Sequence, residues 1–140
     1  MSSKHFILIP VEGPVVALEV EEGKDGYVFL QEALEGGHPE PVFLSGLGHV
    51  LHYEEEAEID GMPVNPRASR LAHDDHHHGP IHGDVLVTAM PVRHVVLDPE
   101  RGVTRIVTEQ YPSVRDSFWE ALNAEVITGS SHLPRERTWG

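Results

Sequence analysis

The sequence predicts an α+β fold, with a small mixed, mainly antiparallel sheet of about five to seven strands and two or three short helices. Three observations support this class. Short apolar runs typical of strands recur along the chain, most of them bounded by glycine or proline. Segments with apolar residues at helical spacing separate some of these runs, while short turn sequences join others directly, which is typical of antiparallel neighbours. The 140 residues include 39% hydrophobic and 24% charged side chains, a globular composition sufficient for one core.

The first part of the chain predicts a β-hairpin followed by a helix. Residues 6–9 and 15–20 are apolar runs separated by a turn rich in glycine and proline. Residues 27–35 place their apolar side chains on one helical face, and the glycines of Gly36-Gly37 provide a helix stop.

The next segment predicts two strands and an acidic turn. Residues 39–41, Pro-Glu-Pro, are expected to interrupt regular structure, and strands are expected over 42–44 and 49–53. Residues 54–60 carry four glutamates and an aspartate, which predicts a solvated turn or edge.

A short helix, a loop and a central strand are expected after this turn. Asn65-Pro66 is typical of an N-cap followed by a first-turn proline, so residues 66–72 should be helical. The polar residues 73–83 predict a loop. The run 84–90 is almost entirely apolar, which predicts a strand buried on both faces.

The last third predicts a second hairpin and a final helix. Residues 92–97 and 103–108 flank a turn of proline and glycine and should pair as antiparallel strands. We expect Ser113 to cap a helix that ends near Asn123 and packs Phe118 or Trp119 on the sheet. The expected organisation is one α+β domain over residues 1–128 with a flexible C-terminal tail over 129–140.

Charge and cysteine content exclude several classes of function. The formal net charge of −13 would repel phosphate backbones and anionic lipid surfaces, so we expect neither direct nucleic-acid binding nor membrane binding. The chain has no cysteine, which excludes disulfides and thiolate metal ligands. Its first residues contain no apolar run long enough for a signal peptide or membrane span, so we expect a cytoplasmic location.

Local motifs over about residues 27–90 resemble a known family. These motifs are the helix Leu30-Gln31-Glu32-Ala33-Leu34 ending at Gly36-Gly37, the acidic residues before Gly61-Met62-Pro63-Val64-Asn65 with Arg67, and the strand Gly83-Asp84-Val85-Leu86-Val87-Thr88. Together they resemble domain of unknown function 3846, found in short proteins of phages, plasmids and other mobile elements. The resemblance implies an accessory role in a mobile element and supplies no catalytic residues. The chain departs from the family pattern in its last third and in the histidines before Gly83.

A histidine-rich loop provides candidate metal ligands. Imidazole and carboxylate groups bind zinc, nickel and copper, and the candidates in this loop are His73, Asp75, His76, His78 and His82. Their order differs from the His-x-His-x-Asp-His pattern of metallo-β-lactamase-type hydrolases. A divalent transition metal such as zinc or nickel, a chance affinity for metal and a solvated loop without metal are all open interpretations, and no other cofactor is expected.

Basic residues on the short helix provide a second candidate site. Asn65, Arg67 and Arg70 lie close enough in sequence to bind an anion or an acidic partner. The alternative is internal pairing of the arginines with the acidic residues 54–60.

Three further histidines are expected to have structural positions. Strand alternation places His49 and His52 on opposite faces, and we expect both at the surface or at a sheet edge. His94 lies in an expected strand, where a packing role is the simplest interpretation.

The leading functional hypothesis is a non-catalytic accessory or regulatory protein that acts by protein–protein interaction, because the sequence contains no nucleophile elbow and no phosphate-binding loop. One alternative is an acidic DNA mimic of the anti-restriction type. A second alternative is a metal-binding protein or metal-dependent hydrolase that uses residues 73–82.

Overall fold

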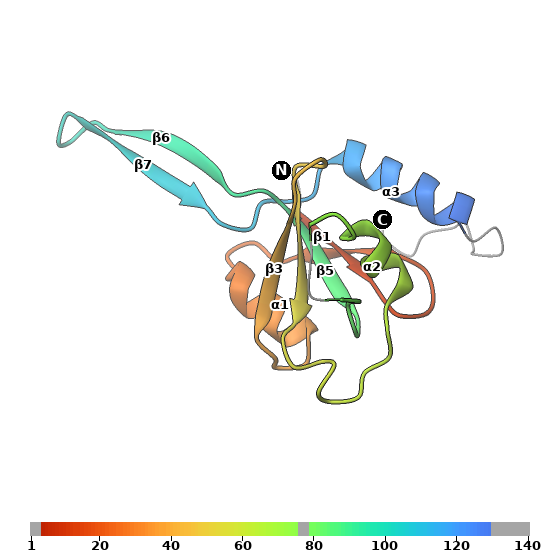
Figure 1. Cartoon of the computed structure of the whole chain (residues 1–140). Helices are drawn as coiled ribbons and strands as arrows, with labels where there is room; N and C mark the ends of the chain where they lie inside the picture. The colour runs from red at the N-terminus through yellow and green to blue at the C-terminus, as the bar shows by residue number, and fades with distance from the viewer. Residues whose placement is uncertain (1–3, 76–78, 130–140) are drawn as a thin grey trace.

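A computed structural model of the chain describes residues 4–75 and 79–129, with seven strands and three helices in that part of the molecule (Figure 1). The elements in chain order are β1 (Lys4–Ile9), β2 (Val16–Val20), α1 (Gly26–Ala33), β3 (Pro39–Leu44), β4 (His49–Glu54), α2 (Pro66–Leu71), β5 (Val85–Ala89), β6 (Val92–Asp98), β7 (Val103–Glu109) and α3 (Asp116–Gly129). The predicted α+β class is therefore confirmed.

Five of the strands form one antiparallel sheet in the order β2-β1-β5-β4-β3. All five side chains of β5 are buried, which confirms the predicted central strand. The strands β6 and β7 pair only with each other and form a separate two-stranded sheet. The expectation of a single mixed sheet is corrected in this respect, since every pairing is antiparallel and the second hairpin stands apart.

Two layers of helices cover the five-stranded sheet. On one face, Leu30 and Leu34 from the α1 region pack with Phe6, Val20 and Leu86. On the other face, a larger cluster joins inward side chains of β1, β3, β4 and β5 to α2 and α3, with Ala68, Ala72, Phe118, Trp119 and Leu122 as the helical contributions. The core is therefore a sheet between two helical layers.

Strand β3 includes the Pro-Glu-Pro segment that was expected to interrupt regular structure. Pro39 lies opposite Glu54 and Pro41 lies opposite His52 in the pairing with β4. A proline lacks the N–H needed to bond a neighbour, so such residues are tolerated in an edge strand. The position of β3 at the end of the sheet explains why the prediction was wrong.

Helix α1 ends at Ala33, two residues before the predicted end at residue 35. Glu35 already has a left-handed backbone with φ of 59°, followed by Gly36 with φ of 81°. The backbone N–H of Gly36 donates to the carbonyl oxygen of Gln31 and closes the helix. Gly37 has a different role, because a Cβ at this position would collide with the side chain of Glu54.

Helix α3 begins after a segment that is tied to β1. Ser113 was expected to cap this helix, but its hydroxyl accepts the backbone N–H of His5 instead, at 3.0 Å. The predicted packing is confirmed, since Phe118 and Trp119 are both buried. The helix extends to Gly129, beyond the predicted end near Asn123, and residues 130–140 of the expected tail lie outside the described part of the chain.

Candidate functional site

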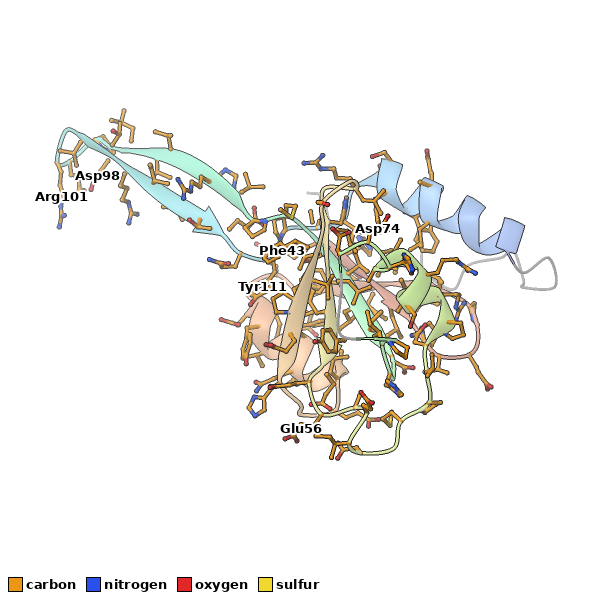
Figure 2. The ribbon with its side chains drawn as sticks, in the orientation of Figure 1. Phe43, Glu56, Asp74, Asp98, Arg101 and Tyr111 are labelled. Carbon is orange, nitrogen blue, oxygen red and sulfur yellow. The ribbon has the colours of Figure 1, made fainter. Side chains whose placement is uncertain are left out.

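The hairpin of β6 and β7, called the arm below, projects away from the rest of the molecule (Figure 1). Its strands are seven residues each and pair in register from Val92 opposite Glu109 to Asp98 opposite Val103. The side chain of Asp98 accepts backbone N–H groups from the turn at its tip, including that of Arg101. Figure 2 shows Asp98 and Arg101 at this tip, far from the five-stranded sheet.

One face of the arm carries a strip of large aliphatic side chains, here called the apolar strip, made of Val95, Leu97 and Ile106. Val95 lies directly opposite Ile106, and Leu97 follows on the same face two residues later. The three side chains are 74%, 63% and 63% exposed. Contiguous exposed aliphatic groups of this kind are typical of a surface that another molecule covers.

A small cavity lies at the root of the arm. Its volume is about 120 Å³, and its lining combines arm-root residues with residues of β3 and β4, namely Pro39, Pro41, Phe43, Val50, His52, Pro91, Gln110 and Tyr111. Phe43 and Tyr111 are labelled in Figure 2 near this junction. The rings and prolines make the cavity mainly apolar, which suits an aliphatic or aromatic group.

His52 lines this cavity and is otherwise buried, contrary to the expected surface or edge position. Its Nε2 lies 2.9 Å from Oγ1 of Thr88, whose own hydroxyl donates to the carbonyl oxygen of Ala89. The hydroxyl therefore accepts from Nε2–H, and the ring is neutral with Nδ1 unprotonated. Burial lowers the pKa of His52 to about 4.

His49 is also buried, on the opposite face of β4. The expected opposite placement of the two rings is confirmed, because His49 stacks on Phe118 while His52 contacts Tyr111. His49 Nδ1 donates to the carbonyl oxygen of Leu47, and Nε2 accepts the backbone N–H of Arg115. Burial lowers the pKa of His49, partly offset by the bond to Leu47. The expected surface or edge position of His49 and His52 was wrong because β4 is an inner strand of the sheet.

His94 lies on the arm and is exposed, so the expected packing role was wrong. Its Nε2 lies 3.2 Å from a carboxylate oxygen of Glu109 on the neighbouring strand. This contact crosses the ribbon on the face opposite the apolar strip.

The candidate metal ligands of the histidine loop are only partly within the described chain. His76 and His78 lie outside the described residues. His73 is exposed beside Asp74, Asp75 accepts a hydrogen bond from the hydroxyl of Ser45, and Nδ1 of His82 lies 2.8 Å from the carbonyl oxygen of Met62. Within residues 4–75 and 79–129, no group of three or more histidine or acidic side chains is placed to hold a metal ion.

Asn65 is completely buried, and both the oxygen and the nitrogen of its side-chain amide form hydrogen bonds. Its Oδ1 accepts the backbone N–H of Ala68, which confirms the predicted N-cap, and its Nδ2 donates to the carbonyl oxygens of Ile9 and Gly83 at 2.9 Å each. The amide therefore joins β1, α2 and the segment just before β5. This placement makes Asn65 part of the fold instead of an accessible anion site.

Arg67 reaches toward β1 and not toward the acidic turn. One guanidinium nitrogen, Nη2, donates to the carbonyl oxygen of Pro10, and the other, Nη1, is buried without a hydrogen-bond partner among the described residues. Burial lowers the pKa of Arg67, and the neighbouring charge of Arg70 lowers it further, against the opposing effect of Asp84. Arg70 is exposed on the same helix.

The acidic turn after β4 borders a second cavity, of about 290 Å³. Its acidic lining residues are Glu35, Glu54, Glu56, Asp60 and Asp84. Figure 2 places Glu56 at the end of the molecule opposite the arm. The acidic cavity and the apolar strip are therefore separate surfaces of different chemistry.

The apolar strip is the feature that the sequence interpretation missed. The hairpin was predicted, but its apolar residues were expected to join a sheet. A signal was present, because each strand carries aliphatic residues on both faces. The pattern alone does not show which face stays uncovered.

Comparisons with known proteins identified no relative of this chain. No described helix combines the length and apolar character needed to cross a membrane. No family model, curated protein or solved structure matches the chain.

Proposed function

We propose that this chain is a non-catalytic accessory protein that acts by binding a protein partner through the arm. The observation that carries the proposal is the exposed apolar strip on a hairpin that has no core of its own. The setting implied by the sequence resemblance, a mobile genetic element, is part of the same proposal.

Two physical arguments support a partner at this position. A two-stranded ribbon alone is marginally stable in water, so a solvated hairpin whose exposed aliphatic side chains include the three of the strip gains stability when a partner covers it. Burial of Val95, Leu97 and Ile106 removes apolar area from water, at about 25 cal/mol for each Å². Both arguments favour association over a solvated arm.

The surrounding charges restrict the kind of partner. Arg93 is the charged residue on the face that carries the strip, at the end nearest the root. A neutral or acidic protein surface with aliphatic groups satisfies both the strip and this arginine. The two alternatives from the sequence, a DNA mimic and a metal-dependent protein, stay predictions.

Site-specific photo-crosslinking tests the proposal. A benzophenone amino acid in place of Leu97 is introduced in cells that naturally carry the gene, and the same probe in place of Ile59 is the matched control. Ile59 is 84% exposed on the turn after β4, outside the arm. We expect a discrete cross-linked product from position 97 that Ile106→Asp abolishes, and no such product from position 59. Equal labelling from both positions, or none from either, would contradict the proposal.

A further inference from the structure

We infer that the partner of the apolar strip is a second copy of this chain, with the two arms packed face to face and antiparallel about a two-fold axis. The inference rests on the proposed function, since it names the partner of the same surface. It depends on the distribution of charge along the arm and over the whole chain.

The arm is the electrically neutral part of a strongly acidic molecule. Residues 92–109 contain three arginines, Arg93, Arg101 and Arg105, and three carboxylates, Asp98, Glu100 and Glu109. The formal excess of −13 therefore lies outside the arm. Two copies repel each other through the rest of the molecule, and the arm is the surface on which they can approach without that repulsion.

An antiparallel arrangement also keeps the acidic parts apart. A seven-residue strand spans about 23 Å, whereas charges are screened over about 8 Å at physiological ionic strength. When the arms overlap along their length, the two five-stranded sheets lie at opposite ends of the paired arms. Their mutual repulsion is then largely screened.

The two ends of the arm are complementary in charge. The root end of the strip face carries Arg93, while Glu109 at the root lies on the other face and contacts Lys4 and His94. The tip carries the carboxylates of Asp98 and Glu100 beside Arg101. Asp98 is engaged with the backbone of the turn, which makes Glu100 the acidic group for an intermolecular contact. Antiparallel pairing places Arg93 of each copy beside Glu100 of the other. Parallel pairing would place the two Arg93 side chains together.

Antiparallel pairing also packs the apolar strip of each copy on the strip of the other. When Arg93 lies beside Glu100 of the other copy, Leu97 of each copy lies opposite the middle of the other arm, near Val95 and Ile106. A contact that is complementary to itself in this way is what a closed two-fold dimer requires.

Sedimentation velocity on the untagged full chain tests the inference. The interface is small, so we expect a weak, reversible dimer of twice the 15.5 kDa monomer mass, forming between about 10 and 500 µM protein. Ile106→Asp should give a monomer throughout this range, and Ile59→Asp should leave the dimer unchanged. Circular dichroism and urea unfolding verify that each variant is folded. A wild-type monomer at every concentration, or a dimer that Ile106→Asp does not affect, overturns the inference.

A charge exchange tests the antiparallel arrangement. Arg93→Glu should weaken the dimer by at least about tenfold. The double variant Arg93→Glu with Glu100→Arg restores the complementary pair in both copies and should recover the wild-type dissociation constant. A double variant that associates no better than the single variant overturns this arrangement.

The result separates this inference from the proposed function. A wild-type monomer whose position-97 probe captures a different polypeptide, in a manner that Ile106→Asp abolishes, removes the second copy as partner and leaves the proposed function standing. Absence of any product from position 97 removes the proposed function itself.

Discussion

Two histidines on one strand hold their protons on different ring nitrogens. His49 donates from Nδ1 and accepts at Nε2, whereas His52 donates from Nε2 to Thr88. Both rings are buried and their pKa values are lowered, so the native state favours the neutral form of each. Stability at acidic pH should therefore depend on these two residues.

The pH dependence contributed by His52 has a definite sign. Its pKa is about 4 in the folded protein and 6.5 as a model value, so the unfolded chain binds the proton more readily. The stabilising contribution is complete above about pH 6.5 and is lost as the pH falls toward 4. At pH 4.5 the loss is about 2.5 kcal/mol.

His52→Gln should reduce the fall in unfolding free energy between pH 7 and pH 4.5 by about 2 to 3 kcal/mol. Urea unfolding of wild type and variant at both pH values measures this difference. His94→Gln is the matched control, because His94 is exposed on the arm. If His52→Gln and His94→Gln keep the same pH dependence as wild type, the assigned burial of His52 is wrong.

Asn65 combines a helix cap with a bridge between strands, and a single substitution separates the two roles. An aspartate in its place would cap α2 as well as asparagine does, but a carboxylate cannot donate to the carbonyl oxygens of Ile9 and Gly83. We expect Asn65→Asp to destabilise the protein by about 3 kcal/mol or more at pH 7, because a buried carboxylate would face two carbonyls.

The control for this substitution is the reverse exchange at the other helix cap. Asp25 is exposed and caps α1 by accepting the backbone N–H of Val28. Asp25→Asn should change the unfolding free energy by less than about 0.5 kcal/mol in the same urea titration. A similarly small effect of Asn65→Asp would mean that capping is the whole role of Asn65.

The secondary-structure elements differ in how much they depend on the rest of the molecule. Of the described residues, those in the two core clusters all lie outside the arm. At the root, the backbone N–H of Ala89 donates to the carbonyl oxygen of Pro112, so the chain enters and leaves the arm at adjacent points. The arm is therefore an addition to a complete sheet.

Removal of the arm should leave the five-stranded sheet intact. Replacement of residues 92–109 by a short glycine linker is expected to change the unfolding free energy by less than about 1 kcal/mol, because no core contact is lost. Urea unfolding and the dispersion of amide NMR signals measure this. Loss of cooperative unfolding would show that the arm is needed for the sheet to form.

Over the whole molecule, the central strand and its neighbours unite distant parts of the sequence. β1 lies between β2, its neighbour in sequence, and β5, which begins at Val85. The hairpins were predictable because a turn joins their strands directly. The pairing of β5 with β1 on one side and with β4 on the other was not, because no local signal relates these strands, and the β4–β5 pairing places β4 inside the sheet with both of its histidines buried.

The candidate site likewise combines features that the sequence predicts with features that depend on the tertiary structure. The turn at the arm tip and the apolar character of Val95, Leu97 and Ile106 are visible in the sequence, and so is the neutral charge of this segment. Their exposure is not, since an aliphatic strand is as compatible with the middle of a sheet as with a solvated ribbon. Asn65 likewise has an evident capping role, while its bonds to Ile9 and Gly83 depend on the folded arrangement.

The sequence by itself determined the α+β class, both hairpins, the cap of α2, the buried strand β5 and the acidic charge, because these depend on short-range sterics, local hydrogen bonds and composition. Only the tertiary structure decided the strand order, the burial of His49 and His52, and the separation of the arm from the sheet. These features depend on which distant surfaces cover one another. The surfaces that cover one another are set by the apolar area buried over the whole molecule, which cannot be determined from any single segment.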